Sequence, residues 1–317
     1  MDEITLGRSG LRVSRMGLGG GGHSRLGLRT GRSDSESIDI VRRALDQGIN
    51  FIDTAESYGT EEIVGHAIRG RDRGKIVVST KKSLSKKGHL RERPITPADL
   101  RAGLEQSLRK LGTDYIDVYH LHGLKLPDYE RAVQALVPEL LDLKDQGKIR
   151  AIGVTEAFNS DRAHAMLQRA LTDDCWDVIM VGFSILNQSA RERVVRATRL
   201  KDIGVLCMFA VRVGLSRPPK LGELMRELIT SGRLESASID PDDPLGFVIR
   251  DGAAKSIVDA AYRFCRDEDG IHVVLSGTGD VAHLEENIVS MNRPPLPPEM
   301  RRRLMEMFGG IDTLSGQ

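Results

Sequence analysis

Three polar side chains lie at the ends of three successive apolar runs of the sequence. Asp53 lies in FIDTA, Lys81 ends KIVVSTK and His122 ends YIDVYHLH. Side chains alternate between two faces along an extended segment, so each of the three shares a face with apolar residues of its own run. Each alone has an ordinary structural explanation, as a helix cap, an exposed cation or a core histidine. Together they are candidate catalytic residues, because packing does not require an acid, an amine and an imidazole at one rim.

Tyr58 follows Asp53 by five residues, in the turn AESYG, where a loop can carry a phenol back over the same rim. A phenol has an ordinary pKa of about 10 and is a poor acid at neutral pH. We expect the Lys81 ammonium to lower the pKa of Tyr58, and Asp53 to hold that ammonium in place. A phenol tuned in this way can give a proton to a carbonyl oxygen. The matching reaction is hydride delivery to the carbonyl carbon, which requires a nicotinamide.

Short β-branched runs alternate with amphipathic helical stretches, which is the pattern of a parallel α/β protein. The expected strands are Met16 to Gly19, Phe51 to Thr54, Ile76 to Lys81, Tyr115 to His122, Ala151 to Thr155, Val178 to Ser184, Gly204 to Ala210 and His272 to Gly277. The expected helices are Ser37 to Gln47, Pro97 to Leu111, Tyr129 to Gln146, Asp161 to Leu171, Arg191 to Lys201, Ile257 to Arg266 and Val281 to Ser290. Such a repeat closes into a barrel or spreads as a doubly wound sheet, and about eight strands favour the barrel. The reactive groups then lie at the carboxyl ends of the strands.

Three segments fall outside this repeat. Residues 4–13 predict a hairpin around Arg8-Ser9-Gly10 that covers the closed end of a barrel. Residues 212–255 separate the seventh strand from its helix and contain one amphipathic piece, Leu221 to Ile229. Residues 83–94 are basic and are either a solvated loop or an attractor of an anionic ligand. The predicted fold is an α/β TIM (β/α)8 barrel with an N-terminal β-hairpin cap and a long insertion after strand 7, forming one domain over residues 1–317.

The composition of the sequence limits the classes of binding partner and the compartments that we expect. The 46 Lys and Arg residues nearly balance the 45 Asp and Glu residues, which argues against a nucleic-acid partner. The longest apolar run, Val205 to Val211, is far shorter than the roughly 20 residues that cross a bilayer, so we expect no membrane span. An acidic amino terminus without an apolar stretch and three scattered cysteines indicate a cytoplasmic protein. No feature of the sequence indicates an oligomeric state.

Longer motifs carry a family resemblance. The runs LGRSGLRVSRMGLGG (6–20), DTAESYG (53–59), VVSTK (77–81), IDVYHLH (116–122) and GKIRAIGV (147–154) resemble the aldo-keto reductases, in the same order and over nearly the whole chain. The resemblance implies a TIM barrel, an NADPH-type cofactor bound without a Rossmann domain, and a tetrad of Asp53, Tyr58, Lys81 and His122. It also implies that Tyr58 donates the proton, the Lys81–Asp53 pair assists it, and His122 orients the substrate carbonyl. Lys82 competes with Lys81, but strand alternation points it to the other face.

The same resemblance assigns nicotinamide contacts, and several of them depart from the family pattern. Thr155 and Glu156 stand where the family has Ser-Asn, and a carboxylate accepts hydrogen bonds but cannot donate them when ionised. Met180 replaces a glutamine. Met208, with Phe209 beside it, replaces an aromatic residue, and its sulfur either packs on a nicotinamide or belongs to the barrel core.

The remaining cofactor residues would hold phosphates and adenosine. Arg212 is a candidate for the pyrophosphate. Ser276, Gly277 and Thr278 lie before a helix and offer an anion site, and Glu286 with Asn287 matches the family's adenine-binding pair. The Lys and Arg that clasp a 2′-phosphate in the family correspond to Gly277 and His283. On family grounds the expected cofactor is NADP(H), with NAD(H) as the alternative.

The predicted function is reduction of an aldehyde or ketone, a small-molecule carbonyl substrate, to an alcohol with NAD(P)H. A Schiff-base lyase is one alternative, because a strand-end lysine such as Lys81 can attack a carbonyl, and borohydride trapping would reveal it. Metal-dependent hydrolysis by His120 and His122 is another, although further ligands are lacking and no metal is expected. A third alternative is a redox-sensing or regulatory subunit that binds the cofactor and turns over slowly.

Overall fold

The computed structural model describes residues 1–86, 93–235 and 239–317. Eight parallel strands close into a barrel in the order β10, β11, β12, β3, β4, β5, β8, β9. The barrel strands are β3 (Met16–Gly19), β4 (Phe51–Asp53), β5 (Val77–Ser83), β8 (Ile116–Leu124), β9 (Ile149–Glu156), β10 (Val178–Gly182), β11 (Gly204–Met208) and β12 (Val273–Ser276). The predicted TIM barrel is therefore confirmed.

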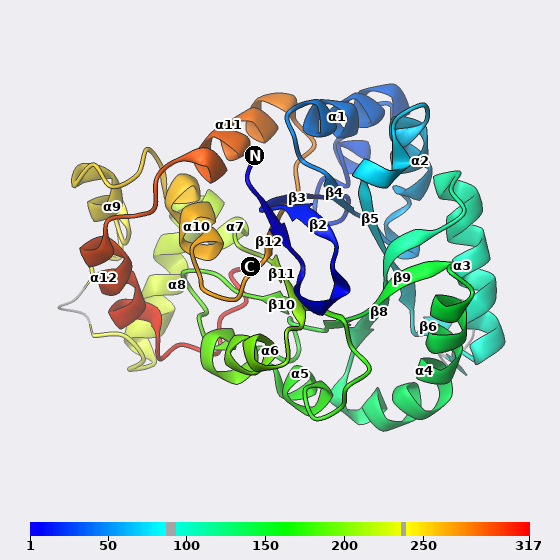
Figure 1. Cartoon of the computed structure of the whole chain (residues 1–317). Helices are drawn as coiled ribbons and strands as arrows, with labels where there is room; N and C mark the ends of the chain where they lie inside the picture. The colour runs from blue at the N-terminus through cyan, green and yellow to red at the C-terminus, as the bar shows by residue number, and fades with distance from the viewer. Residues whose placement is uncertain (87–92, 236–238) are drawn as a thin grey trace.

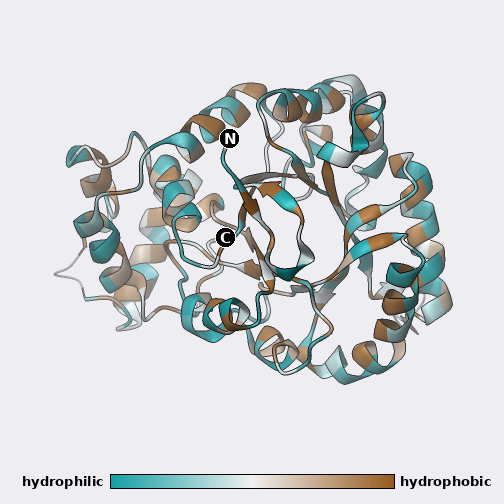
Figure 2. Cartoon of the chain, in the orientation of Figure 1, coloured by the Kyte–Doolittle hydropathy of each residue, from teal (hydrophilic) through white to brown (hydrophobic). Residues whose placement is uncertain are grey.

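Helices form a ring outside the barrel (Figure 1). They are α1 (Asp34–Asp46), α2 (Glu61–Ile68), α3 (Pro97–Leu111), α4 (Tyr129–Asp145), α5 (Ala165–Ala170), α6 (Arg196–Leu200), α7 (Val213–Ser216), α8 (Pro218–Thr230), α9 (Gly246–Arg250), α10 (Ile257–Arg266), α11 (Val281–Asn292) and α12 (Pro298–Phe308). Their polar residues face outward and their apolar residues face the sheet (Figure 2). None of the helices in the described part of the chain has the length and apolar character needed to cross a membrane.

Strand alternation divides the core in two. One buried cluster fills the barrel interior and includes Phe51, Val77, Val118, Met180 and Leu206. The alternate residues of the same strands join a larger cluster between the sheet and the helices. Because the interior is filled by side chains, polar groups gain access to solvent at the ends of the barrel.

A hairpin covers the amino-terminal end of the barrel, as the sequence predicts (Figure 1). Strands β1 (Glu3–Thr5) and β2 (Arg12–Ser14) pair antiparallel, and the short 3-10 helix η1 (Gly7–Ser9) joins them. Leu6 and Leu11 of this hairpin belong to the interior cluster. Arg8 reaches the opposite side of the barrel, where its guanidinium donates to the carbonyl oxygen of Trp176 (2.8 Å). The reactive end must therefore be the opposite, carboxyl end.

The predicted insertion after the seventh strand contains α7, α8 and α9, and α7 and α9 contact α10. In segment 83–94, β6 (Ser85–Lys86) pairs with β7 (Arg93–Pro94). Half of this basic segment, residues 87–92, lies outside the described residues, so the prediction that it attracts an anion is not tested by the structure.

Several helix predictions needed correction. Helix α1 begins earlier than expected, because Ser33 and Glu36 form a reciprocal capping box. The helix predicted over Asp161 to Leu171 begins only at Ala165, since the Asp161 carboxylate accepts from the amides of Ala165 and Met166. The stretch from Arg191 to Lys201 opens with a wider turn, η6 (Arg191–Val195), before α6. Helices α2, α7, α9 and α12 were not predicted.

The hairpin provides a test of the closed end. Gly7 has φ +47, and a Cβ there would lie 2.5 Å from the carbonyl oxygen of Asp202, whereas Gly10 has φ +67 and open space around it. We expect Gly7→Ala to lower the free energy of unfolding by about 2 kcal/mol or more, and Gly10→Ala by about 1 kcal/mol. Urea unfolding of both variants measures the difference. Equal losses would show that crowding against the barrel contributes nothing.

Candidate active site

Lys81 and Asp53 form a buried ion pair at the carboxyl end of β4 and β5. The Lys81 ammonium lies 2.6 Å from each carboxylate oxygen of Asp53 and 2.7 Å from the carbonyl oxygen of Thr54. The Lys81 side chain is 0% exposed and that of Asp53 is 5% exposed. Burial raises the pKa of Asp53, while the charge of Lys81 and the hydroxyl of Ser79 oppose that rise. These oxygen acceptors hold the lysine as a charged ammonium, so Lys81 is poorly placed to act as the free amine that a Schiff base requires.

Tyr58 lies above this pair, on the short helix η3 (Glu56–Tyr58). The Lys81 nitrogen is 5.1 Å from the centroid of the phenol ring, and the phenol oxygen is 3.4 Å from Nε2 of His122. The close approach of the β3–α1 loop needs glycine at position 21, because a Cβ there would lie 2.6 Å from the ring. The structure thus brings the four predicted catalytic side chains together.

The expected direction of the Tyr58 pKa shift was wrong. Burial raises the pKa of Tyr58, and the charge of Lys81 opposes this effect without overcoming it. The sequence shows the neighbouring charge but not how completely the phenol is removed from water. The consequence is a phenol that keeps its proton until negative charge develops beside it.

Two histidines of β8 point to the same side of the barrel wall. Burial, together with the Lys81 charge, lowers the pKa of His122 to about 3, so its imidazole is neutral. His120 is fully buried, and its Nε2 lies 3.1 Å from the hydroxyl of Ser79. Across the described residues, no group of three or more His, Cys, Asp or Glu side chains is arranged to hold a metal ion.

Lys82 takes the other face of β5, as strand alternation predicts. Its ammonium lies 2.6 Å from the carboxylate of Glu56, and its side chain packs over Gly103 of α3. It does not reach the Tyr58 phenol.

A cavity of about 520 Å³ opens beside His122. It lies between the β5–β6 segment and helix α4, and its lining includes Ser57, Ser83, Leu84, His122, Leu124 and Leu136. This mixed apolar and hydroxyl lining is typical of small-molecule sites.

The three residues expected to contact the nicotinamide lie in different environments. The Thr155 hydroxyl accepts a hydrogen bond from the amide of Gly123 (2.7 Å), and Met180 is buried in the barrel interior. Glu156 is turned into the protein: it accepts from the amide of Gly182 (2.7 Å) and lies 2.9 Å from Nδ1 of His164. Its carboxylate is therefore already bonded within the protein, unlike the free amide that the family resemblance implied.

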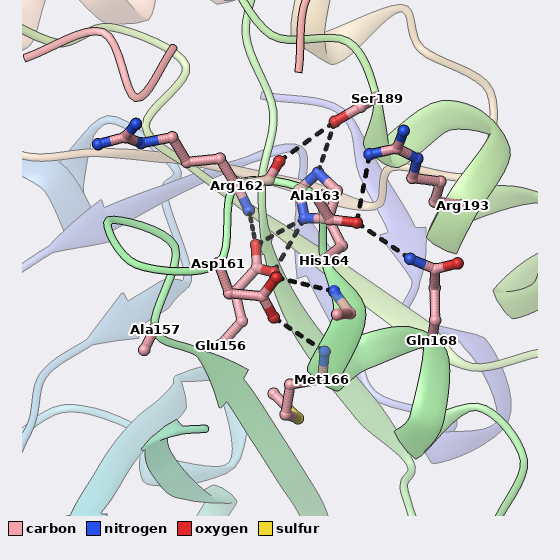
Figure 3. Close-up of polar contacts among 12 residues, drawn as sticks. Glu156, Ala157, Asp161, Arg162, Ala163, His164, Met166, Gln168, Ser189 and Arg193 are labelled. Carbon is pink, nitrogen blue, oxygen red and sulfur yellow. Dashed lines mark hydrogen bonds and ion pairs between the residues drawn. The ribbon is translucent and has the colours of Figure 1, made fainter. Parts of the chain in front are cut away.

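Figure 3 shows His164 between Glu156 and Ser189. Nε2 of His164 lies 3.0 Å from the Ser189 hydroxyl, an order of groups that resembles a nucleophilic triad. However, that hydroxyl donates its hydrogen to Oδ1 of Asn187 (2.6 Å), so Nε2 must be the donor to Ser189. The three hydrogen-bonded side chains Glu156, His164 and Ser189 therefore support the structure at the end of β9.

Met208 ends β11, and Phe209 and Arg212 follow it. Met208 packs at the edge of the interior cluster, and Phe209 has φ +69, which is strained for a bulky residue. The Phe209 ring lies 5.8 Å from that of Phe158, with the Arg212 guanidinium 4.0 Å from its centroid. Arg212 also donates to the carbonyl oxygen of Ser315 (3.0 Å), and burial lowers its pKa to about 10.

The polar side chains at the end of β12 and after it are already hydrogen-bonded within the protein. The buried hydroxyl of Ser276 lies 2.9 Å from that of Tyr262 and accepts from Nδ2 of Asn287 (3.0 Å). The Thr278 hydroxyl accepts from the amide of Asp280 (3.0 Å). Gly277 lies next to the loop after β3, and His283 and Glu286 are exposed on α11.

Asp280 was missed by the sequence analysis. Its carboxylate caps α11 by accepting from the amides of Ala282 (2.8 Å) and His283 (3.2 Å), and it lies 2.8 Å from the Arg32 guanidinium. An acid directly before a helical run is the signal that would have found it. Ser79 was also missed, and His120 was considered only as a metal ligand, although each lies two residues before a catalytic candidate on the same face.

The residues expected to hold a dinucleotide stay predictions. The Arg212 guanidinium and the start of α11 are groups of the kind that bind phosphates, whereas the hydroxyls of Thr155, Ser276 and Thr278 are buried and already hydrogen-bonded within the protein. The nicotinamide end is the least well matched, because Glu156 is bonded elsewhere and Met180 offers no hydrogen bond.

Known proteins match this chain over most of its length. The aldo/keto reductase family profile matches residues 15–307. The aldo-keto reductase YhdN of Bacillus subtilis is 29% identical, over 90% of this chain and 87% of that protein. The NADH-specific methylglyoxal reductase of Escherichia coli is 32% identical, over 73% of each chain. The holo form of aldo-keto reductase AKR11C1 from Bacillus halodurans superposes with a TM-score of 0.74 and 25% identity, over 98% of this chain and 97% of that one. The chain therefore belongs to the aldo/keto reductase family, whose activity is the reduction of carbonyl groups with a nicotinamide cofactor.

Proposed function

We propose that Tyr58 is the proton donor in the reduction of a small aldehyde or ketone that enters beside His122. The observation that carries this proposal is the position of the Tyr58 phenol, 3.4 Å from His122 and directly beside the buried Lys81 ammonium. The cavity next to these groups provides room for the substrate. A bound nicotinamide supplies the hydride that adds to the carbonyl carbon.

The roles of the four side chains follow from their charges. Tyr58 stays protonated at rest because burial raises its pKa. When negative charge builds on the carbonyl oxygen, Tyr58 transfers its proton there, and the Lys81 ammonium stabilises the phenolate that remains. Asp53 keeps Lys81 charged, while neutral His122 offers a ring nitrogen to orient the carbonyl.

We also propose that Asp280 favours NAD(H) over NADP(H). The hydrogen bonds it accepts from the start of α11 lower the pKa of Asp280, so a negative charge already occupies the helix terminus where a 2′-phosphate would need to bind. Arg32, a nearby cation, is paired with Asp280 and Glu36. The relative named as an NADH-specific reductase supports this preference.

The proposed compartment remains the cytoplasm, on the cysteine content alone.

Tyr58→Phe tests the proton donor. We expect kcat to fall about 100-fold or more, because general acid catalysis contributes roughly that much. Dinucleotide affinity should stay unchanged, as measured by equilibrium fluorescence titration. Tyr115→Phe is the matched control, because the Tyr115 hydroxyl lies at the other end of β8 and donates to the carbonyl oxygen of Arg73 (3.4 Å). Full turnover by Tyr58→Phe would refute its role, and a wild-type protein that binds NADH without hydride transfer in stopped flow would favour the redox-sensing alternative.

Asp280→Ser tests the cofactor preference. Serine keeps a helix-capping oxygen and removes the charge, so NADPH should bind about tenfold more tightly while NADH affinity changes little. Calorimetric titration with both dinucleotides measures this, and Asp280→Glu, which retains the charge, is the control. Equal binding of NADH and NADPH by the wild type would contradict the proposal.

The pH dependence tests the state of His122. A pKa of about 3 lies below the ordinary value, so His122 is already neutral at every pH above roughly 4. We therefore expect kcat for reduction to show no change from a histidine between about pH 5 and 8. A limb near pH 6.5 that disappears in His122→Gln would show that the imidazole titrates during the reaction.

A further inference from the structure

A series of hydrogen-bonded side chains, from His120 through Ser79 to Asp53, lies beneath the Lys81–Asp53 ion pair, inside the barrel. We propose that His120 and Ser79 are positioning residues that fix the Asp53 carboxylate and, through it, the Lys81 ammonium. This inference rests on the roles proposed above for Asp53 and Lys81. It extends the site by one layer into the barrel interior.

Three neighbouring strands supply the chain. In the strand register Asp53 of β4 pairs with Ser79 of β5, and Lys81 of β5 pairs with His120 of β8. The Ser79 hydroxyl lies 2.8 Å from Oδ1 of Asp53, and Nε2 of His120 lies 3.1 Å from the same hydroxyl. The side chains of Ser79, Lys81 and His120 belong to residues that are 0% exposed, so water does not compete for these bonds.

Donor and acceptor counting fixes the direction of the chain. An ionised carboxylate only accepts hydrogen bonds, so the single hydrogen of the Ser79 hydroxyl goes to Asp53. The Ser79 oxygen must then accept from His120, which places a hydrogen on Nε2 of that ring. Burial, aided by the charge of Lys81, lowers the pKa of His120 well below its usual range, so the ring is neutral. With the hydrogen on Nε2, counting leaves Nδ1 without one, and within the described residues the buried Nδ1 has no hydrogen-bond partner.

The fold holds the His120 ring in one place. Gly153 of β9 pairs with His120, and a Cβ at Gly153 would lie 2.2 Å from Nδ1 of the ring. The imidazole therefore occupies space that only glycine leaves open. With its plane fixed by packing, the ring offers Nε2 to Ser79 in a single orientation, which restricts rotation of the Asp53 carboxylate under Lys81.

The chain also has an electrostatic consequence. The hydrogen bond from Ser79 lowers the pKa of Asp53 and so helps to keep it ionised against the effect of burial. Without this bond the carboxylate supports the Lys81 ammonium less well, and the ammonium in turn stabilises the Tyr58 phenolate less well. Tyr58 then becomes a weaker acid.

Ser79→Ala and His120→Phe break the chain at two points, and the phenyl ring keeps the space over Gly153 filled. We expect kcat to fall about tenfold in both variants while KM and the Kd for NADH stay unchanged. The alkaline limb of the kcat profile for reduction should move up by about half a pH unit or more, because the donor phenol is a weaker acid. His120→Gln, which retains an N–H donor, should recover part of the rate.

The matched control is Tyr119→Phe. Tyr119 is the next residue along β8, is equally buried, and belongs to the cluster on the outer face of the barrel. Tyr119→Phe also removes a buried hydroxyl, but it should leave the alkaline limb of the kcat profile at its wild-type pH. Normal folding of Ser79→Ala and His120→Phe with an unmoved limb would overturn the proposal.

Nitrogen-15 NMR of the resting wild-type protein tests the chain without any assay of activity. The expected spectrum assigns His120 as a neutral ring with hydrogen on Nε2 between about pH 5 and 9. A ring with hydrogen on Nδ1, or one that titrates in this range, would overturn the proposal even if the variants failed to fold. Full turnover by Tyr58→Phe would instead refute the proposed function and leave the NMR result standing.

Discussion

The buried charge of Lys81 is the constraint on which the rest of the site depends. An ammonium removed from water costs several kcal/mol unless oxygen acceptors replace its hydration. Two Asp53 oxygens and the Thr54 carbonyl do this, and they arrive from a different strand. The pair therefore exists only when β4 and β5 lie in one register, which closure of the barrel enforces. The buried charge of Lys81 therefore depends on the pairing of strands in the closed sheet.

The same charge acts differently on its neighbours. It adds to burial in keeping His122 and His120 neutral, and it works against burial at Tyr58. The imidazoles of His120 and His122 are therefore neutral, because both burial and the Lys81 charge lower their pKa. The Tyr58 phenol keeps its proton, because burial raises its pKa by more than Lys81 lowers it. In the reaction that we propose, these groups are fixed before the substrate enters, so little reorganisation would be needed when charge develops on the carbonyl oxygen.

Much of the fold and the four central residues could be predicted from the sequence, since alternation along a strand determines which side chains share a face. It placed Lys81 inward and Lys82 outward, as the structure confirms. What failed depended on three-dimensional environment. The raised pKa of Tyr58 reflects burial that no local pattern records, and Glu156 pairs with His164, a residue in the following loop. Helix α2 was missed because Gly65 interrupts its interior, whereas Asp280 could have been found from its place before α11.

Barrel closure also has a consequence for synthesis of the chain. The first barrel strand, Met16–Gly19, hydrogen-bonds to the last, Val273–Ser276. While the protein emerges from the ribosome, the early strand must wait for residues 273–276 to be made before its second neighbour exists. Until these two strands pair, the growing sheet has two open edges able to pair with other chains. The nascent protein is therefore open to misassembly over most of the synthesis of the barrel.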